Sequence, residues 1–225
     1  MFSLVFATPL KKFNPNDVSH YLTKEGIERL ETQNRYMKDT KISTDLSLVQ
    51  FYLWTPERDD VWIFNSSVTP EELRAQGFDS RRSTKFIAHG WNSGGDFGNG
   101  FRKGKKKIYD YQKHFADYKT IFPGYHAHPA MAYNIIAVHW QPLSTWDNYF
   151  TAAKNSVKVG QYAGQVLGLD LLINGLGQKP EQIHAIGHSL GAHLVGHFAR
   201  TIQFKAGSIA RVTGKFNSIL YVKQV

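Results

Sequence analysis

The sequence contains no cysteine among its 225 residues. Disulfide bonds, thiol nucleophiles and metal sites with cysteine ligands are therefore excluded for this chain. No apolar run reaches the length that is needed to cross a lipid bilayer. The first ten residues are apolar but include no basic residue, so they predict either the remnant of a secretion signal or simply a first strand.

Acidic residues are scarce relative to basic ones, since 18 aspartates and glutamates accompany 27 lysines and arginines. The net charge of +9 favours anionic partners such as phospholipid head groups, heparan-like glycans or nucleic acid. No nucleic-acid-binding motif accompanies the charge, so no nucleic-acid partner is expected. The densest basic run contains Arg102, Lys103, Lys105, Lys106 and Lys107. It predicts either a solvated loop or a contact to anionic lipid or glycan.

The remaining composition is that of a globular domain, with 42% hydrophobic and 14% aromatic residues. Apolar and aromatic runs predict strands at 47–54, 61–64, 133–140 and 209–214, with 61–64 as the antiparallel partner of 47–54. Helices are predicted after Thr69, a candidate N-cap before Pro70, and over 151–174. Strand and helix then alternate, which indicates right-handed βαβ units and a mostly parallel sheet flanked by helices.

One stretch combines a short strand, a Gly-x-Ser-x-Gly turn and an amphipathic helix. The strand begins at Ile183, the turn runs from Gly187 to Gly191, and apolar residues recur every four positions from Leu190 to Ile202. This order is the context of a nucleophile elbow, with Ser189 at the apex. Gly187 and Gly191 are small enough to let strand and helix pass closely. The main-chain N–H of Leu190 is then placed to receive a developing oxyanion.

A second turn accompanies the elbow. A strand that begins at Thr84 runs into His89-Gly90-Trp91, a His-Gly-aromatic turn that can supply another oxyanion donor. The two motifs together resemble those of the pancreatic-lipase-like family of neutral lipases, which includes insect lipases and phospholipases of the A1 class. The resemblance implies an α/β-hydrolase fold, hydrolysis of lipid esters, a Ser-Asp-His triad and an extracellular location. By this resemblance Ser189 matches the nucleophile, and the main-chain N–H groups of Trp91 and Leu190 match the oxyanion hole.

The same resemblance divides the chain and shows what it lacks. It spans residues 47–214 as a lipase-like domain, preceded by an N-terminal extension at 1–46 and followed by a divergent tail at 215–225. In the family, the strand after the nucleophile helix leads into a turn that carries the catalytic Asp, and the catalytic His lies much further along. Here Phe216 stands in place of the Asp, and no histidine follows His197. The chain is therefore expected to be truncated at its C-terminus relative to the family.

Two functions remain open at this point. The first is a carboxylic-ester hydrolase of the lipase class that acts through a serine; the second is a catalytically incomplete lipase-fold protein with a lipid-binding, storage or regulatory role. No cofactor and no metal are expected. His193 and His197 share a helix face, but Leu194 occupies the place of the glutamate in the zincin pattern. They are interpreted as packing residues, and the glycine-rich loop at 92–100 as a flexible connection.

Overall fold

The computed structural model describes residues 43–57, 61–91, 133–145 and 149–215. Six strands form one sheet in the order β2-β1-β4-β3-β5-β6. Their bounds are β1 Gln50–Trp54, β2 Trp62–Phe64, β3 Thr84–Ala88, β4 Asn134–His139, β5 Ile183–His188 and β6 Arg211–Lys215. Strands β4, β3, β5 and β6 pair in parallel, whereas β1 pairs antiparallel with β2 and with β4. The mixed sheet confirms the predicted α/β-hydrolase fold.

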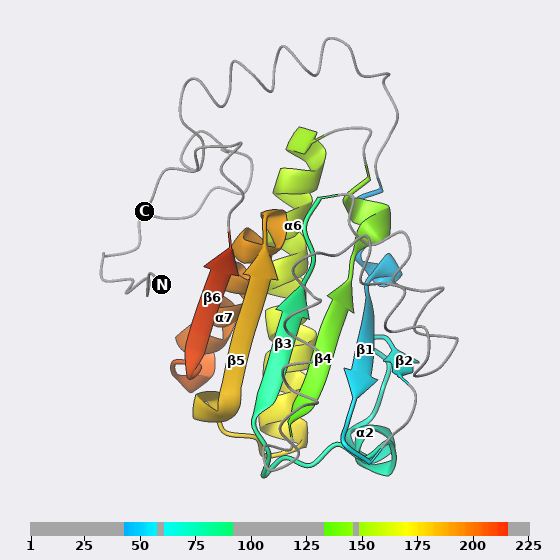
Figure 1. Cartoon of the computed structure of the whole chain (residues 1–225), viewed down its shortest axis with the longest axis vertical. Coiled ribbons are helices and arrows are strands. Elements are labelled where there is room, and N and C mark those ends of the chain that lie inside the picture. Colours follow the sequence, from blue (N-terminus) through cyan, green and yellow to red (C-terminus); the bar gives the residue numbers. More distant parts are fainter. Residues whose placement is uncertain (1–42, 58–60, 92–132, 146–148, 216–225) are drawn as a thin grey trace.

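The helices lie against this sheet. Helix α2 spans Pro70–Ala75, α6 spans Tyr149–Ala163, the π-helix η5 spans Gly164–Gly175, and α7 spans Leu190–Ala206. Short 3-10 turns are η2 Leu46–Leu48, η4 Gln141–Leu143 and η6 Pro180–Gln182. Helices α6 and α7 cover the same face of the sheet, and the parallel strands all point their carboxyl ends toward one end of it (Figure 1). Among the described residues, no helix has the length and apolar character needed to cross a membrane.

The apolar face of α7 is the one that the sequence predicts. Leu190 is 3% exposed, and Leu194, Phe198 and Ile202 are fully buried. The ring of Phe198 stacks on that of Phe86 in β3, with centroids 4.0 Å apart. Burying one such side chain contributes about 1.5–3 kcal/mol, so this face accounts for much of the attachment of α7 to the sheet.

Two local predictions near the start of the domain have different outcomes. The first strand begins at Gln50 rather than at residue 47, because Leu46–Leu48 form a 3-10 turn in which the Asp45 side chain accepts a hydrogen bond from the Ser47 N–H. The prediction for the helix that follows Thr69 is confirmed. Thr69 caps it through its hydroxyl, which accepts from the Glu72 N–H at 3.2 Å, while the Glu72 carboxylate accepts from the Thr69 N–H at 2.8 Å.

The long helix predicted at 151–174 is present as α6 followed without a break by η5. Its second half is wound as a π-helix, which the apolar periodicity did not predict. Gly160, Gly164 and Gly168 face α7 at intervals of four residues. A β-carbon added at Gly164 would lie 2.9 Å from the Phe198 carbonyl oxygen, and one added at Gly168 would lie 2.6 Å from Ile202 Cδ1. This row of glycines therefore lets the two helices approach closely.

Candidate active site

Ser189 lies between the end of β5 and the start of α7, as the N-cap residue of that helix. Its φ of 55° and ψ of −123° make it the one non-glycine residue with positive φ in the described part of the chain. Residues with a β-carbon rarely adopt such a backbone conformation, which is typically held in place by the surrounding fold at functional sites. The Ser189 side chain makes no capping hydrogen bond to α7.

The glycines on either side of Ser189 lie where strand and helix pass closely. A β-carbon added at Gly187 would collide with the carbonyl group of Gly191 and would lie 2.6 Å from Ala192 Cα. One added at Gly191 would collide with the Ala88 carbonyl and would lie 2.5 Å from that of His89. All of the atoms that these β-carbons would meet belong to the backbone, so they cannot move aside as the end of a flexible side chain would. The turn that holds Ser189 consequently requires glycine at both positions.

The His-Gly-aromatic turn at the end of β3 lies directly against this elbow. Strands β3 and β5 are neighbours, with Ala88 paired to Gly187. A β-carbon added at Gly90 would lie 2.8 Å from Ser189 Cβ and 3.0 Å from the His188 carbonyl oxygen. The fold therefore brings Ser189, Leu190 and Trp91 to one end of the sheet. As the first residue of α7, Leu190 has an N–H without an acceptor inside the helix.

His89 holds this turn in place, a role that the sequence analysis missed. Its ring is fully buried and stacks on the Trp140 indole, with centroids 5.5 Å apart. The Trp140 N–H donates to His89 Nε2 at 3.2 Å, so the ring proton resides on Nδ1, which donates to the Gly90 carbonyl at 2.9 Å. The Trp140 indole N–H donates in turn to the His89 carbonyl at 3.0 Å. Burial lowers the pKa of His89 to about 3, which keeps the ring neutral.

The side chain of Trp91 is anchored to the connection between β4 and α6. Its indole N–H donates to the Thr145 carbonyl at 2.7 Å. Its ring meets the Tyr149 ring edge-on, with centroids 5.1 Å apart. Burial raises the pKa of Tyr149 to about 12, so this neighbour stays neutral. The only sequence signal for these contacts is the His-Gly-aromatic pattern itself, because Trp140 and Thr145 lie about fifty residues further along the chain.

His193 and His197 lie on α7, next to α6. A β-carbon added at Gly160 of α6 would lie 2.8 Å from His197 Cβ, so that histidine packs between the helices. Burial lowers the pKa of both rings to about 4. Within the described ranges, no three side chains of the histidine, cysteine and carboxylate type gather where they could hold one ion.

Strand β6 ends at the same end of the sheet as β5. It runs parallel to β5, and Lys215 at its end is paired with His188. Phe216 follows immediately and lies outside the described residues, as do most of the N-terminal extension and of the tail at 215–225. The glycine-rich loop at 92–100 and the basic run lie outside them too, so the structure gives no position for Arg102, Lys103, Lys105, Lys106 and Lys107.

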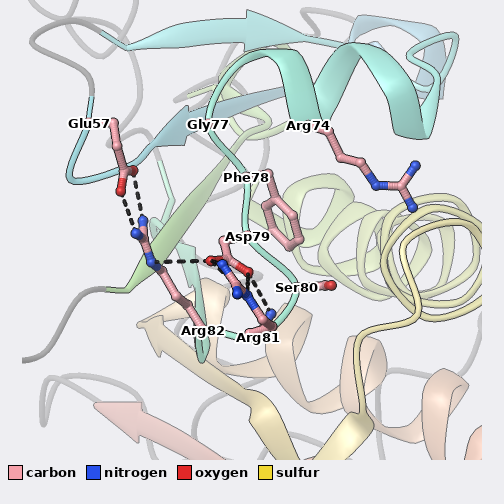
Figure 2. A pocket seen from close by; sticks show the side chains of 8 residues that line it. All are labelled: Glu57, Arg74, Gly77, Phe78, Asp79, Ser80, Arg81 and Arg82. Carbon is pink, nitrogen blue, oxygen red and sulfur yellow. Dashed lines mark hydrogen bonds and ion pairs between the residues drawn. The ribbon is translucent and has the colours of Figure 1, made fainter.

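A pocket of about 420 Å³ lies at the opposite end of the sheet, between α2 and the turn that precedes β3 (Figure 2). Arg82 bridges the carboxylates of Glu57 and Asp79, and Arg81 donates to Asp79 at 2.8 Å. The hydrogen bonds from Arg81 lower the pKa of Asp79 to about 2. These charged side chains form ion pairs with one another. We therefore interpret the pocket as a set of ion pairs that holds the loop before β3 in place, and not as a reaction centre.

Comparison with known proteins shows which family the chain belongs to. A model of the family described as "Lipase" matches residues 18–218. The chain belongs to the lipase family. Its relatives place this lipase chain in the pancreatic-lipase-like group. It is 30% identical over 165 residues to pancreatic lipase-related protein 2 of Rattus norvegicus and 28% identical over 165 residues to inactive pancreatic lipase-related protein 1 of Homo sapiens.

A third relative is pancreatic triacylglycerol lipase of Oryctolagus cuniculus, to which the lipase chain is 28% identical over 165 residues. Each of these three matches covers 73% of this chain and 30% of the relative. The lipase chain thus spans about a third of the length of the curated relatives that it matches. The relatives include proteins named as lipases and proteins named as inactive, so family membership alone does not assign an activity.

Proposed function

We propose that this chain carries the nucleophile and the oxyanion hole of a carboxylic-ester hydrolase that acts on lipid esters. The observation that supports this most strongly is the positive φ of Ser189 on a turn packed against Gly90. A fold maintains such a strained serine where the strain serves a purpose. Ser189 is the proposed nucleophile, Trp91 and Leu190 the proposed main-chain oxyanion donors, and Gly187 and Gly191 the glycines that make the turn possible.

In this proposal the Ser189 hydroxyl attacks the ester carbonyl. The negative charge that develops on the carbonyl oxygen is stabilised by the N–H groups of Trp91 and Leu190 and by the N-terminus of α7. In another serine hydrolase, one such donor is worth about 2.7–4 kcal/mol of transition-state stabilisation. The serine proton must pass to a general base. His193 and His197 are poor candidates, because burial disfavours their protonated forms.

A second function is favoured by a separate observation. Phe216 directly follows β6, at the position where the resemblance to the family leads us to expect the catalytic Asp. Some of the relatives are named as inactive. A chain of this kind would keep the lipase fold for lipid binding, storage or regulation. In either case we propose a lipid ester at an interface as the ligand, an extracellular location, and a contact to anionic lipid or glycan through the basic run at 102–107.

Labelling of the purified protein with a fluorescent fluorophosphonate separates the two functions. If the hydrolase function holds, the wild-type protein reacts covalently and the Ser189→Ala variant does not, because the oxygen of the proposed nucleophile is then gone. Turnover of a short-chain ester measured on the same samples shows whether a base assists the serine. A folded wild-type protein that takes no label would contradict the hydrolase function and favour the lipid-binding alternative.

Replacing His89 by phenylalanine tests the oxyanion hole. The Gly90 carbonyl and the Trp91 N–H belong to one planar peptide group, so the hydrogen bond from His89 also fixes the direction of that N–H. Loss of this bond is expected to slow labelling of Ser189 about tenfold or more. The His89→Asn variant retains a donor and an acceptor and should recover part of the rate. Equal labelling rates in wild type and His89→Phe, with both folded, would count against Trp91 as a donor.

A further inference from the structure

The peptide group between Gly90 and Trp91 is held at both of its ends. At the Gly90 end, the carbonyl accepts the hydrogen bond from His89 Nδ1 at 2.9 Å. At the Trp91 end, the indole N–H donates to the Thr145 carbonyl at 2.7 Å. The first contact fixes the rotation of the peptide plane, and the second fixes the side chain on the Cα atom at which that plane ends. Together they determine where the main-chain N–H of Trp91 points.

Both hydrogen bonds lead to one short segment after β4, residues 140–145. Trp140 begins this segment, and its main-chain N–H donates to His89 Nε2 at 3.2 Å. Thr145 ends it and accepts from the Trp91 indole. The 3-10 turn η4 lies between them, and its backbone hydrogen bonds keep the two ends of the segment at a fixed distance. A shift of the 140–145 segment would therefore move both contacts of the oxyanion turn together.

Helix α6 keeps the 140–145 segment and the indole in place. Asn155 of α6 is 1% exposed, and its side-chain amide donates to the Leu143 carbonyl at 2.9 Å. The Tyr149 ring, in the first turn of α6, meets the Trp91 ring edge-on. An edge-on contact between aromatic rings depends on the orientation of both, so Tyr149 restricts the direction of the Trp91 side chain. The indole is thus held by a hydrogen bond and by a ring contact.

The oxyanion turn is in direct contact with the nucleophile turn. A β-carbon added at Gly90 would lie 2.8 Å from Ser189 Cβ, so little space separates the two turns. A misplacement of about 1 Å in a catalytic site can slow the reaction about a hundredfold. The contacts that hold the Trp91 side chain are therefore part of the catalytic geometry, although the indole itself is not the oxyanion donor.

We propose that the Trp91 indole positions the oxyanion donor and that the 140–145 segment and Tyr149 hold it for this purpose. The inference rests on the proposed function, because it concerns how the Trp91 N–H is directed toward the oxyanion. Any residue except proline supplies a main-chain N–H at this place, whereas only a side chain with a ring and a donor reaches both Tyr149 and the Thr145 carbonyl. The indole acts on the rate at which Ser189 attacks and not on the affinity for the ligand.

The kinetics of labelling by a fluorophosphonate test this role. The reaction joins Ser189 Oγ to phosphorus, releases fluoride and passes the serine proton to a base or to water, while the phosphoryl oxygen occupies the oxyanion hole. Trp91→Phe keeps a ring beside Tyr149 but loses the donor to Thr145. The maximal labelling rate should fall about tenfold, with little change in the reagent concentration that gives half of it. Trp62→Phe is the matched control, because Trp62 lies on β2 at an edge of the described sheet.

A thiophosphoryl analogue of the same reagent separates positioning from a general loss of stability. Sulfur is a weak hydrogen-bond acceptor, so the analogue gains little from the oxyanion donors. The wild-type protein should therefore react faster with the oxygen reagent, and Trp91→Phe should reduce this preference, which a protein that is merely less stable would retain. Tyr149→Leu should reduce the preference too, and Tyr149→Phe, which keeps the ring, should restore it.

The outcomes distinguish this inference from the proposed function. A folded wild-type protein that takes no label would contradict the proposed function and this inference with it. Labelling of the wild type, with the same rate and the same preference for oxygen in Trp91→Phe, would overturn this inference alone. Equal losses in Trp91→Phe and Trp62→Phe would overturn it as well, since they would show a general effect of removing an indole.

Discussion

Replacing Gly160 by alanine is expected to lower the free energy of unfolding by about 2 kcal/mol. The new methyl group would collide with the Leu194 carbonyl in α7 and lie 2.8 Å from His197 Cβ. Overpacking of this kind costs about 1–3 kcal/mol, and sometimes more where backbone must shift. The better helix propensity of alanine returns only part of that cost. Urea denaturation of the variant and the wild type, monitored by circular dichroism, measures the difference.

Gly196 provides the matched control for this prediction. It lies within α7 as Gly160 lies within α6, but a β-carbon added there would have no neighbour within 4 Å. Gly196→Ala should therefore leave stability unchanged or raise it by up to about 1 kcal/mol. If Gly160→Ala behaved in the same way, the close approach of α6 and α7 would not be a source of stability.

The sequence was most informative where one local pattern had to satisfy several constraints at once. A strand, a Gly-x-Ser-x-Gly turn and an apolar repeat of four residues fit few arrangements other than the one between β5 and α7. The face of α7 followed from spacing alone, because Leu194, Phe198 and Ile202 recur at the helical period and all are buried. The capping of α2 followed in the same way from Thr69 and Pro70.

The features that could not be predicted depend on residues far apart in the chain. The Gly160, Gly164 and Gly168 row is visible in the sequence, but its meaning requires knowing that α7 lies opposite it. The ring hydrogen bond of His89 to Trp140 joins the ends of two strands that are neighbours only in the folded sheet. Apolar periodicity also cannot separate α-helix from π-helix over 164–175, since both bury one face of the same segment.

Acidification from pH 7.5 to pH 5.5 is expected to lower the free energy of unfolding by about 3 kcal/mol through His89 and His197 alone. His89 is fully buried and His197 is 7% exposed, and burial lowers their pKa values to about 3 and about 4. In the unfolded chain both titrate near 6.5. Below that pH the unfolded state therefore binds more protons than the folded state. The contribution of the two histidines to stability is fully present above pH 6.5 and is lost as the pH falls toward their pKa values in the folded state. Each histidine contributes up to about 1.4 kcal/mol per pH unit.

Urea denaturation at a series of pH values measures this slope, and two variants identify its source. His197→Gln should make the slope between pH 6.5 and 5 shallower by about 1 kcal/mol per pH unit. Asp79→Asn should leave that slope unchanged, because the Asp79 carboxylate, whose pKa is about 2, loses its contribution only below about pH 4. Burial also lowers the pKa of His139 and of His193, so they act in the same direction as His89 and His197. Stability that stayed constant down to pH 5 would mean that these rings accept protons within the folded protein. It would then contradict the assignment of His89 as a neutral ring whose hydrogen bond fixes the Gly90 peptide.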